Sequence, residues 1–262
     1  MTWLAGTASY LHHHRDLTHG VVGAPLLALA AAGALRLGLA GARFLPLLGC
    51  SLLGAGLHVL MDLWTSYGTR ALSPFDRTWY AWDTVFIVDP WVLLLLGAGL
   101  VAWRSPQLAR QLASLSLGLV AAYVGARFLL HAQAVATARE RVPRAVRLAA
   151  LPHPLSPLRW RIIADTGPDY WIGTLSLEGD SPPLARRPKR SETPAVGIAR
   201  RSEVAAIFLD FSRFPWLEVA DDPEGTAVTW SDLRFDQAGR AGFVTRVVVA
   251  PDGRIRSQAF RF

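Results

Sequence analysis

The chain has 262 residues, of which 52% are hydrophobic, and it carries a formal net charge of +7. Residues 1–139 contain 14 charged side chains, nine Arg and five Asp, whereas residues 140–262 contain 33. The mild positive excess is spread along the chain, so we expect no nucleic-acid partner. The single cysteine, Cys50, excludes a disulfide within the chain. The split in charge predicts a membrane domain over 1–139 and a soluble domain over 140–262.

The first half contains four windows that are apolar enough for membrane helices, each of which needs about 20 residues. These windows are 21–40, 44–63, 84–103 and 108–130. A link of about three residues joins the first two, so we expect an antiparallel hairpin. Four crossings place the N-terminal segment, the loop 64–83 and the soluble domain on one face. The Arg residues are nearly balanced between the two faces, and we expect this face to be cytoplasmic.

The second half alternates strand-like segments with Pro-rich connections. Residues 202–211 predict a short helix that Ser202 caps at its N-terminus. Residues 142–157 and 179–194 are predicted to be connections. Aromatic and β-branched residues predict strands at 160–165, 170–177 and 226–235, and a hairpin at 245–260. The expected fold class is an α-helical membrane domain of about four transmembrane helices, followed by a small α+β, mainly antiparallel β, soluble domain.

Histidine and aspartate side chains at the membrane surface are the strongest candidates for chemistry. His58 and Asp62 are four residues apart and therefore share one helix face. His14 and His19 precede the first apolar window, on the same membrane face. Ionisable groups at membrane depth are costly without a partner. We expect all four to bind a divalent metal ion, with zinc favoured over manganese or iron. The alternative is a His–Asp hydrogen bond that only ties helices together.

Other polar residues nearby have two interpretations each. The guanidinium of Arg15 suits an anionic substrate oxygen, or it anchors the chain to lipid head groups. Asp16 and Asp83 suit a general base or a ligand, although Asp16 also fits a first-turn acid that the helix dipole favours. Asp89 either orients the site from the third window or begins its helix. We predict Arg15, Asp16 and Asp83 as the catalytic residues.

The combined motifs resemble a known family. They are HRDLTHG at 14–20, HVLMDLWTSYGTRALSPFDRTWYAWDTVFIVDP at 58–90, FSRFPW at 211–216 and DLRF at 232–235. The chain resembles the membrane-bound metal-dependent hydrolases, also called LexA-binding, inner-membrane-associated hydrolases, over nearly its whole length. The resemblance implies a bacterial inner-membrane location. It also implies functional roles for the residues at the motif positions, which are His14, Arg15, Thr18, His19, His58, Asp62, Asp83 and Asp89.

The sequence departs from that family pattern at two residues and in its N-terminal segment. Asp16 stands where Gly is usual, and Gly20 stands where Ser is usual. Family members usually begin with a further segment that carries L-T-H and P-D-x-D elements, whereas Met1 here lies about a dozen residues before the His cluster. We therefore expect either a start assigned too late or a shortened member that lacks those ligands.

The sequence thus predicts a multi-pass inner-membrane enzyme that uses a divalent metal ion to hydrolyse an ester or phosphoester. A site at head-group depth predicts membrane lipids as surroundings and a small-molecule or lipid-like substrate. The rival hypothesis is a non-catalytic membrane scaffold whose soluble domain binds a partner protein. A transporter has less support, because no polar residues lie at mid-membrane.

Overall fold

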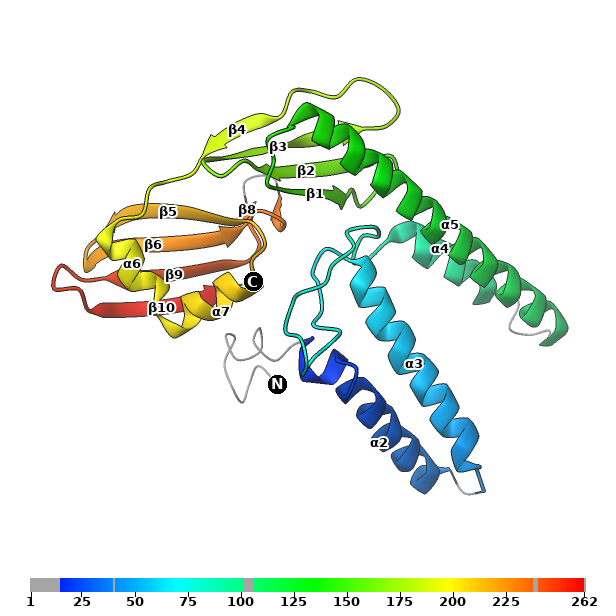
Figure 1. The fold of residues 1–262 in the computed structure, drawn as a ribbon. Helices are drawn as coiled ribbons and strands as arrows, with labels where there is room; N and C mark the ends of the chain where they lie inside the picture. Colours follow the sequence, from blue (N-terminus) through cyan, green and yellow to red (C-terminus); the bar gives the residue numbers. More distant parts are fainter. Residues whose placement is uncertain (1–14, 40, 101–105, 238–239, 262) are drawn as a thin grey trace.

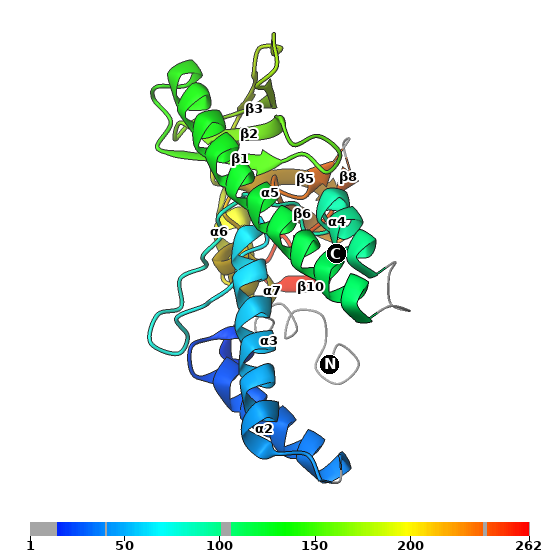
Figure 2. The same cartoon turned by 90° about the vertical axis from the view of Figure 1, so that its right-hand side faces the viewer.

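The computed structural model describes residues 15–39, 41–100, 106–237 and 240–261 (Figure 1). A 3-10 turn, η1 (Leu17–His19), leads into helix α2 (Gly23–Gly38), which packs against α3 (Phe44–Trp64) in the predicted antiparallel hairpin. Helix α4 (Pro90–Leu100) packs against the long helix α5 (Pro106–Arg141). The second pair leans away from the first, and the two sheets lie at one end of both pairs (Figures 1 and 2).

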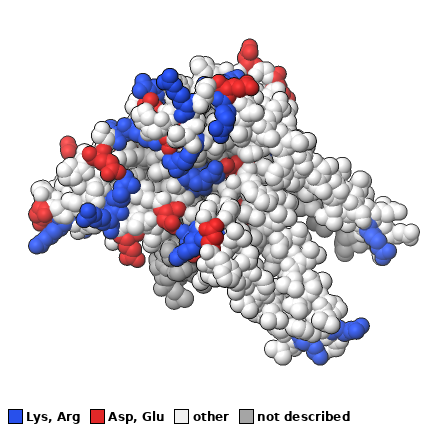
Figure 3. Space-filling model, viewed as in Figure 1, with Lys and Arg blue, Asp and Glu red and all other residues white. Residues whose placement is uncertain are grey.

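Two of the described helices, α3 and α5, are long and apolar enough to cross a membrane, whereas α2 is shorter at 16 residues. Figure 3 shows that the surface of the helices is almost free of charge except at their far tips, while charged side chains gather over the sheets. A surface of this kind suits lipid on the helices and water on the sheets. The helical part thus carries two candidate membrane helices, and the predicted count of four is not established.

Two of the predicted helix boundaries are wrong. Hydrophobicity predicts the third helix over 84–103, but residues 84–89 are not helical and α4 begins at Pro90. Proline suits the first helical position because its missing N–H would have no partner there. Hydrophobicity predicts that the fourth helix ends at about 130, but α5 continues to Arg141. The added turns bury Ala134 and Ala138 against the first sheet, so tertiary packing extends the helix.

The first sheet is an antiparallel meander in the order β1-β2-β3-β4. Its strands are β1 (Arg147–Pro152), β2 (Arg159–Asp165), β3 (Asp169–Ser176) and β4 (Ala185–Pro188). The predicted strands at 160–165 and 170–177 are confirmed as β2 and β3. β1 and β4 lie in segments predicted to be connections. Both end at a proline, a residue that strands tolerate at their ends and at sheet edges.

The second sheet has the strand order β10-β9-β6-β5, and all its pairings are antiparallel. The bounds of its elements are α6 (Pro194–Arg200), α7 (Glu203–Phe211), β5 (Pro215–Asp222), β6 (Gly225–Asp232), β9 (Val244–Val249) and β10 (Ile255–Arg261). The short strands β7 (Asp236–Gln237) and β8 (Arg240–Ala241) form a separate ribbon. Ser202 caps α7 as predicted, since its side chain accepts from the Ala205 N–H. α6 and β5 were not predicted.

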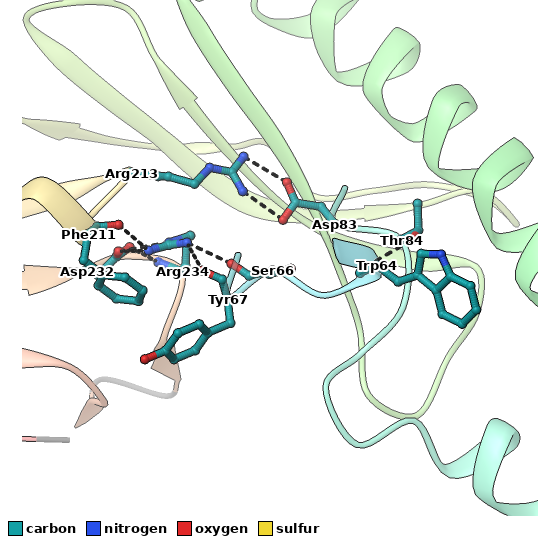
Figure 4. Close-up of polar contacts among 9 residues, drawn as sticks. All are labelled: Trp64, Ser66, Tyr67, Asp83, Thr84, Phe211, Arg213, Asp232 and Arg234. Atoms are coloured by element: carbon teal, nitrogen blue, oxygen red, sulfur yellow. Dashed lines mark hydrogen bonds and ion pairs between the residues drawn. The ribbon is translucent and has the colours of Figure 1, made fainter. Parts of the chain in front are cut away.

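The second sheet and the loop 65–89 share a buried aromatic contact. Tyr67 from the loop lies against Phe211 at the end of α7, with ring centroids 4.9 Å apart, and Phe235 and Phe243 pack around both rings. Figure 4 shows this junction together with the polar contacts that reinforce it. The loop therefore connects the helices to the soluble domain through a small core of its own.

Candidate metal centre

Three predicted ligands converge beside η1 and the last turns of α3. The Nε2 atoms of His19 and His58 are 3.1 Å apart, and the Oδ2 of Asp62 lies 3.5 Å from the first and 3.7 Å from the second. A tetrahedral zinc ion with bonds of about 2.0–2.1 Å separates its ligand atoms by about 3.3 Å. The three separations therefore fit a single ion. Among the described residues, this is the group of His, Cys, Asp and Glu side chains that suits a metal.

The cluster is closed on one side and open on the other. The side chains of His19 and Asp62 are 15% and 10% exposed, whereas that of His58 is 65% exposed. Catalytic zinc sites commonly have three protein ligands and one position open to water or substrate. His14, the fourth predicted ligand, lies outside the described residues.

Arg15 fixes the carboxylate of Asp62. Its Nη2 lies 3.0 Å from Oδ1, which leaves Oδ2 facing the two imidazoles, and its guanidinium covers the Tyr67 ring at 4.4 Å. Arg15 has a φ of 57°, in the region that non-glycine residues rarely adopt. Hydrogen bonds from Thr69 and from the Arg70 N–H to the Arg15 carbonyl hold this conformation. The strained backbone thus aims the side chain at the ligand.

Thr18 and burial prepare His19 for coordination. The Thr18 hydroxyl lies 2.8 Å from Nδ1 of His19. When Nδ1 carries the proton and donates to Thr18, Nε2 keeps a lone pair for a metal. Burial, and then the charges of His58 and Arg15, lower the pKa of His19 to about 4. The imidazole is therefore neutral at physiological pH, as a ligand must be.

The two departures from the family pattern meet at Ser73. The Asp16 carboxylate accepts hydrogen bonds from Ser73 Oγ at 2.6 Å, from Arg70 at 3.1 Å and from Arg77 at 3.0 Å. Burial would raise the pKa of Asp16, but these contacts hold it below its usual value. A Cβ on Gly20 would lie 2.3 Å from the Ser73 carbonyl oxygen. Asp16 and the bare Gly20 together let the loop pack against the turn that carries His19.

Residues 1–134, which include the whole cluster, match the family described as YdjM inner membrane protein. The chain belongs to the YdjM inner membrane protein family. Membership agrees with the membrane family that the motifs resemble and supports the bacterial inner membrane as its location. It does not establish metal binding or hydrolysis, which stay predictions.

Two further comparisons concern the rest of this YdjM family chain. Residues 194–261, from α6 to β10, match the YfhP C-terminal alpha/beta plait domain. The uncharacterized protein YfhP of Bacillus subtilis (strain 168) is 28% identical over 259 residues, which cover 97% of this chain and 78% of YfhP. No solved structure matches the chain.

Two other predicted residues of the YdjM-matching region lie outside the cluster. Both carboxylate oxygens of Asp83 accept from Arg213, at 3.0 and 2.9 Å (Figure 4). Asp89 precedes Pro90 and caps the N-terminus of α4, since its Oδ1 accepts from the N–H groups of Trp91 and Val92. This contact favours the helix-start interpretation of Asp89 over an orienting role. The catalytic role of Asp83 stays a prediction.

Sequence reasoning missed the arginines that dock the soluble domain onto the loop. Arg234 is buried, pairs with Asp232 at 2.7 Å, and donates to the carbonyls of Ser66, Tyr67 and Phe211 (Figure 4). Arg70 pairs with Asp210 of α7 as well as with Asp16. The DLRF motif at 232–235 contains both Arg234 and its partner Asp232, but the motif alone indicates no role for them.

Proposed function

We propose that this chain is a membrane-bound, metal-dependent hydrolase whose site lies at the membrane surface. The observation that carries the proposal is the convergence of His19 Nε2, His58 Nε2 and Asp62 Oδ2 at separations that one zinc ion would impose. Manganese or iron would also accept two imidazoles and a carboxylate. When bound, such a cation lowers the pKa of a water and polarises a carbonyl or phosphoryl oxygen.

The side chains around the ligands support this proposal because they orient the ligand atoms toward one another. Arg15 orients Asp62, and Thr18 orients His19. A substrate contact by Arg15 would add to its pairing with Asp62, because the guanidinium fork presents several donors. The exposed edge of His58 is the side from which substrate would approach. Asp16 is engaged by three donors, so a structural role suits it better than proton transfer.

The substrate that this position favours is an ester or phosphoester of a lipid-like molecule. The cluster stands at the end of α3, a helix long and apolar enough to span a bilayer, so the site would lie near head-group depth. We propose four crossings, with α2 and α4 completing the set, and with the site and the soluble domain facing the cytoplasm. If the chain is instead a non-catalytic scaffold, we propose that its soluble domain binds a partner protein.

Metal content tests the function directly. The full chain, purified in a non-ionic detergent, should contain about one zinc, manganese or iron per molecule by elemental analysis. His58→Ala should lose most of the metal and still fold with one cooperative thermal transition, because the His58 side chain is largely exposed. His153→Ala is the matched control, since it removes a histidine from the soluble domain. Wild type should then cleave ester or phosphoester lipids in a screen, and His58→Ala should not.

Two outcomes would overturn the proposal. A metal-free wild type that is unchanged by added zinc would argue against the site. So would a His58→Ala variant that keeps its metal. Either result would favour the scaffold, in which the His and Asp side chains only join η1 to α3. Lower thermal stability in His58→Ala without any change in metal content would point the same way.

A further inference from the structure

A second cavity, separate from the His–Asp cluster, lies where the loop 65–89 meets both sheets. Its volume is about 530 Å³, within the range of small-molecule sites. The loop 65–89 contributes Ser66, Tyr67, Phe86 and Ile87. The soluble domain contributes the remaining lining residues, which are Leu151, Pro152, His153, Pro154, Arg161, Arg187, Arg234, Phe235 and Asp236. The proposed hydrolase function uses none of the charged residues in this set.

The charges that line this cavity leave one positive charge in excess. Arg234 is compensated by Asp232, its buried partner. Arg161 and Arg187 share the one remaining carboxylate, that of Asp236. Nη1 of Arg187 lies 3.5 Å from Oδ2, while Arg161 donates to the Asp236 backbone carbonyl. Three guanidiniums therefore face two carboxylates, and two of the guanidiniums have donors to spare for an anion.

Apolar side chains make up much of the rest of the lining, among them Phe86, Ile87 and Leu151. Ile87 and its neighbour Val88 are exposed immediately before α4, and Leu155 is exposed beside the lining residue Pro154. Leu155 belongs to the loop 153–158 between β1 and β2. Arg127 of α5 holds this loop against the helices by donating to the Pro157 carbonyl. Exposed apolar side chains thus flank the cavity on both loops, and they offer a surface along which a lipid chain could enter.

We propose that this cavity binds a single-chain lipid with a monoanionic head group, such as a fatty acid. The head would contact Arg187 and Arg161, displacing Arg187 from its long contact with Asp236. The acyl chain would lie along Phe86, Ile87 and Leu151. The excess of one positive charge matches one negative head, and a lining that combines guanidiniums with apolar side chains matches an amphiphile. Binding requires no metal and does not depend on the proposed hydrolase function.

Photocrosslinking in a neutral bilayer tests this site. The probe is palmitic acid with a diazirine in its chain, added to the full chain in phosphatidylcholine nanodiscs with a chelator present. Peptide mass mapping should find adducts at 86–88 and 151–154. Arg187→Gln should reduce these adducts about tenfold, as expected for losing a hydrogen bond between charged groups. Arg187 is 45% exposed, so this variant should fold as wild type does.

The neighbouring residue in β4 supplies the matched control. Arg186 is 58% exposed and pairs with Asp169 on the opposite face of the strand, so Arg186→Gln removes the same charge outside the cavity. It should leave the adducts unchanged, and the methyl ester of the probe should label the cavity about as weakly as the acid labels Arg187→Gln. Equal losses in both variants, equal labelling by acid and ester, or adducts confined to α3 and α5 would each overturn the proposal. His58→Ala should label as wild type does.

Discussion

At the scale of single residues, the Thr18 hydroxyl lies against Nδ1 of His19, whose Nε2 faces His58. Thr18→Val keeps the shape of the side chain but removes the oxygen that lies 2.8 Å from Nδ1. Outer contacts of this kind are commonly worth about 10–100-fold in metal affinity. We expect zinc affinity to fall by that amount, measured by competition with a chromophoric chelator. Thr78→Val, which removes a hydroxyl bonded to Asp76, is the control. Equal affinities would remove Thr18 from the site.

Gly20 is the second residue with a specific expectation, because a Cβ there would meet the Ser73 carbonyl at 2.3 Å. Restoring the serine that the family pattern favours should therefore destabilise this chain. Overpacking of this kind costs about 1–3 kcal/mol. Gly20→Ser should show a lower thermal transition than Gly33→Ser, since the Cβ position of Gly33 in α2 meets nothing within 4 Å. Transitions that coincide would contradict the close approach.

At the scale of elements, one buried carboxylate ties the first sheet together. Asp165 at the end of β2 accepts from Arg147 of β1 at 2.7 Å and from Lys189 beyond β4 at 2.6 Å. Burial alone would raise its pKa, but the hydrogen bonds from Lys189, Arg147 and the Gly167 N–H hold the pKa below the usual value. The folded state thus binds this proton less readily than the unfolded chain does.

The sign of this shift gives a pH dependence. The stabilisation by ionised Asp165 is complete above the unfolded pKa of about 3.9 and disappears as the pH falls through the lower folded pKa. The thermal transition of wild type should therefore fall more steeply below about pH 4 than that of Asp165→Asn, which should be less stable at pH 7. Asp180→Asn, at an exposed position, should follow wild type. Parallel curves for wild type and Asp165→Asn would refute the assignment.

The elements also show how far the sequence alone could be interpreted. Strands with strong aromatic and β-branched character, such as β2 and β3, were predictable, and so was the pairing of His58 with Asp62 by helical spacing. β1 and β4 were not, because neither RLAALP nor ARRP contains a β-branched or aromatic residue, and both strands are stabilised by pairing with their neighbours. The contact of His19 with His58 followed from topology, whereas the engagement of Arg15 with Asp62 depends on a left-handed backbone that no sequence pattern announces.

At the scale of the whole molecule, arginine side chains decide how the soluble domain sits on the helices. Arg213 reaches from the segment between α7 and β5 to Asp83 in the loop, and Arg234 reaches the same loop from the turn after β6. Arg127 of α5 donates to the Thr84 carbonyl beside that aspartate. The same loop also carries Thr69 and Arg70, which donate hydrogen bonds to the Arg15 carbonyl. The loop therefore contacts both the soluble domain and the residue that pairs with Asp62 of the cluster.

The pair of Asp83 and Arg213 therefore distinguishes a docking role from a catalytic one. If Asp83 acts by docking, Asp83→Ala and Arg213→Ala should raise hydrogen exchange of the loop 65–89 to the same extent, and the double variant should add little. A bidentate, partly buried pair should show a coupling of about 1–3 kcal/mol in the thermal stability cycle. Removing the more exposed pair of Arg246 and Asp222 should change neither measurement, because surface ion pairs contribute about 0–1 kcal/mol. If Asp83→Ala abolished lipid hydrolysis while loop exchange stayed unchanged, Asp83 would be catalytic and the docking role would be wrong.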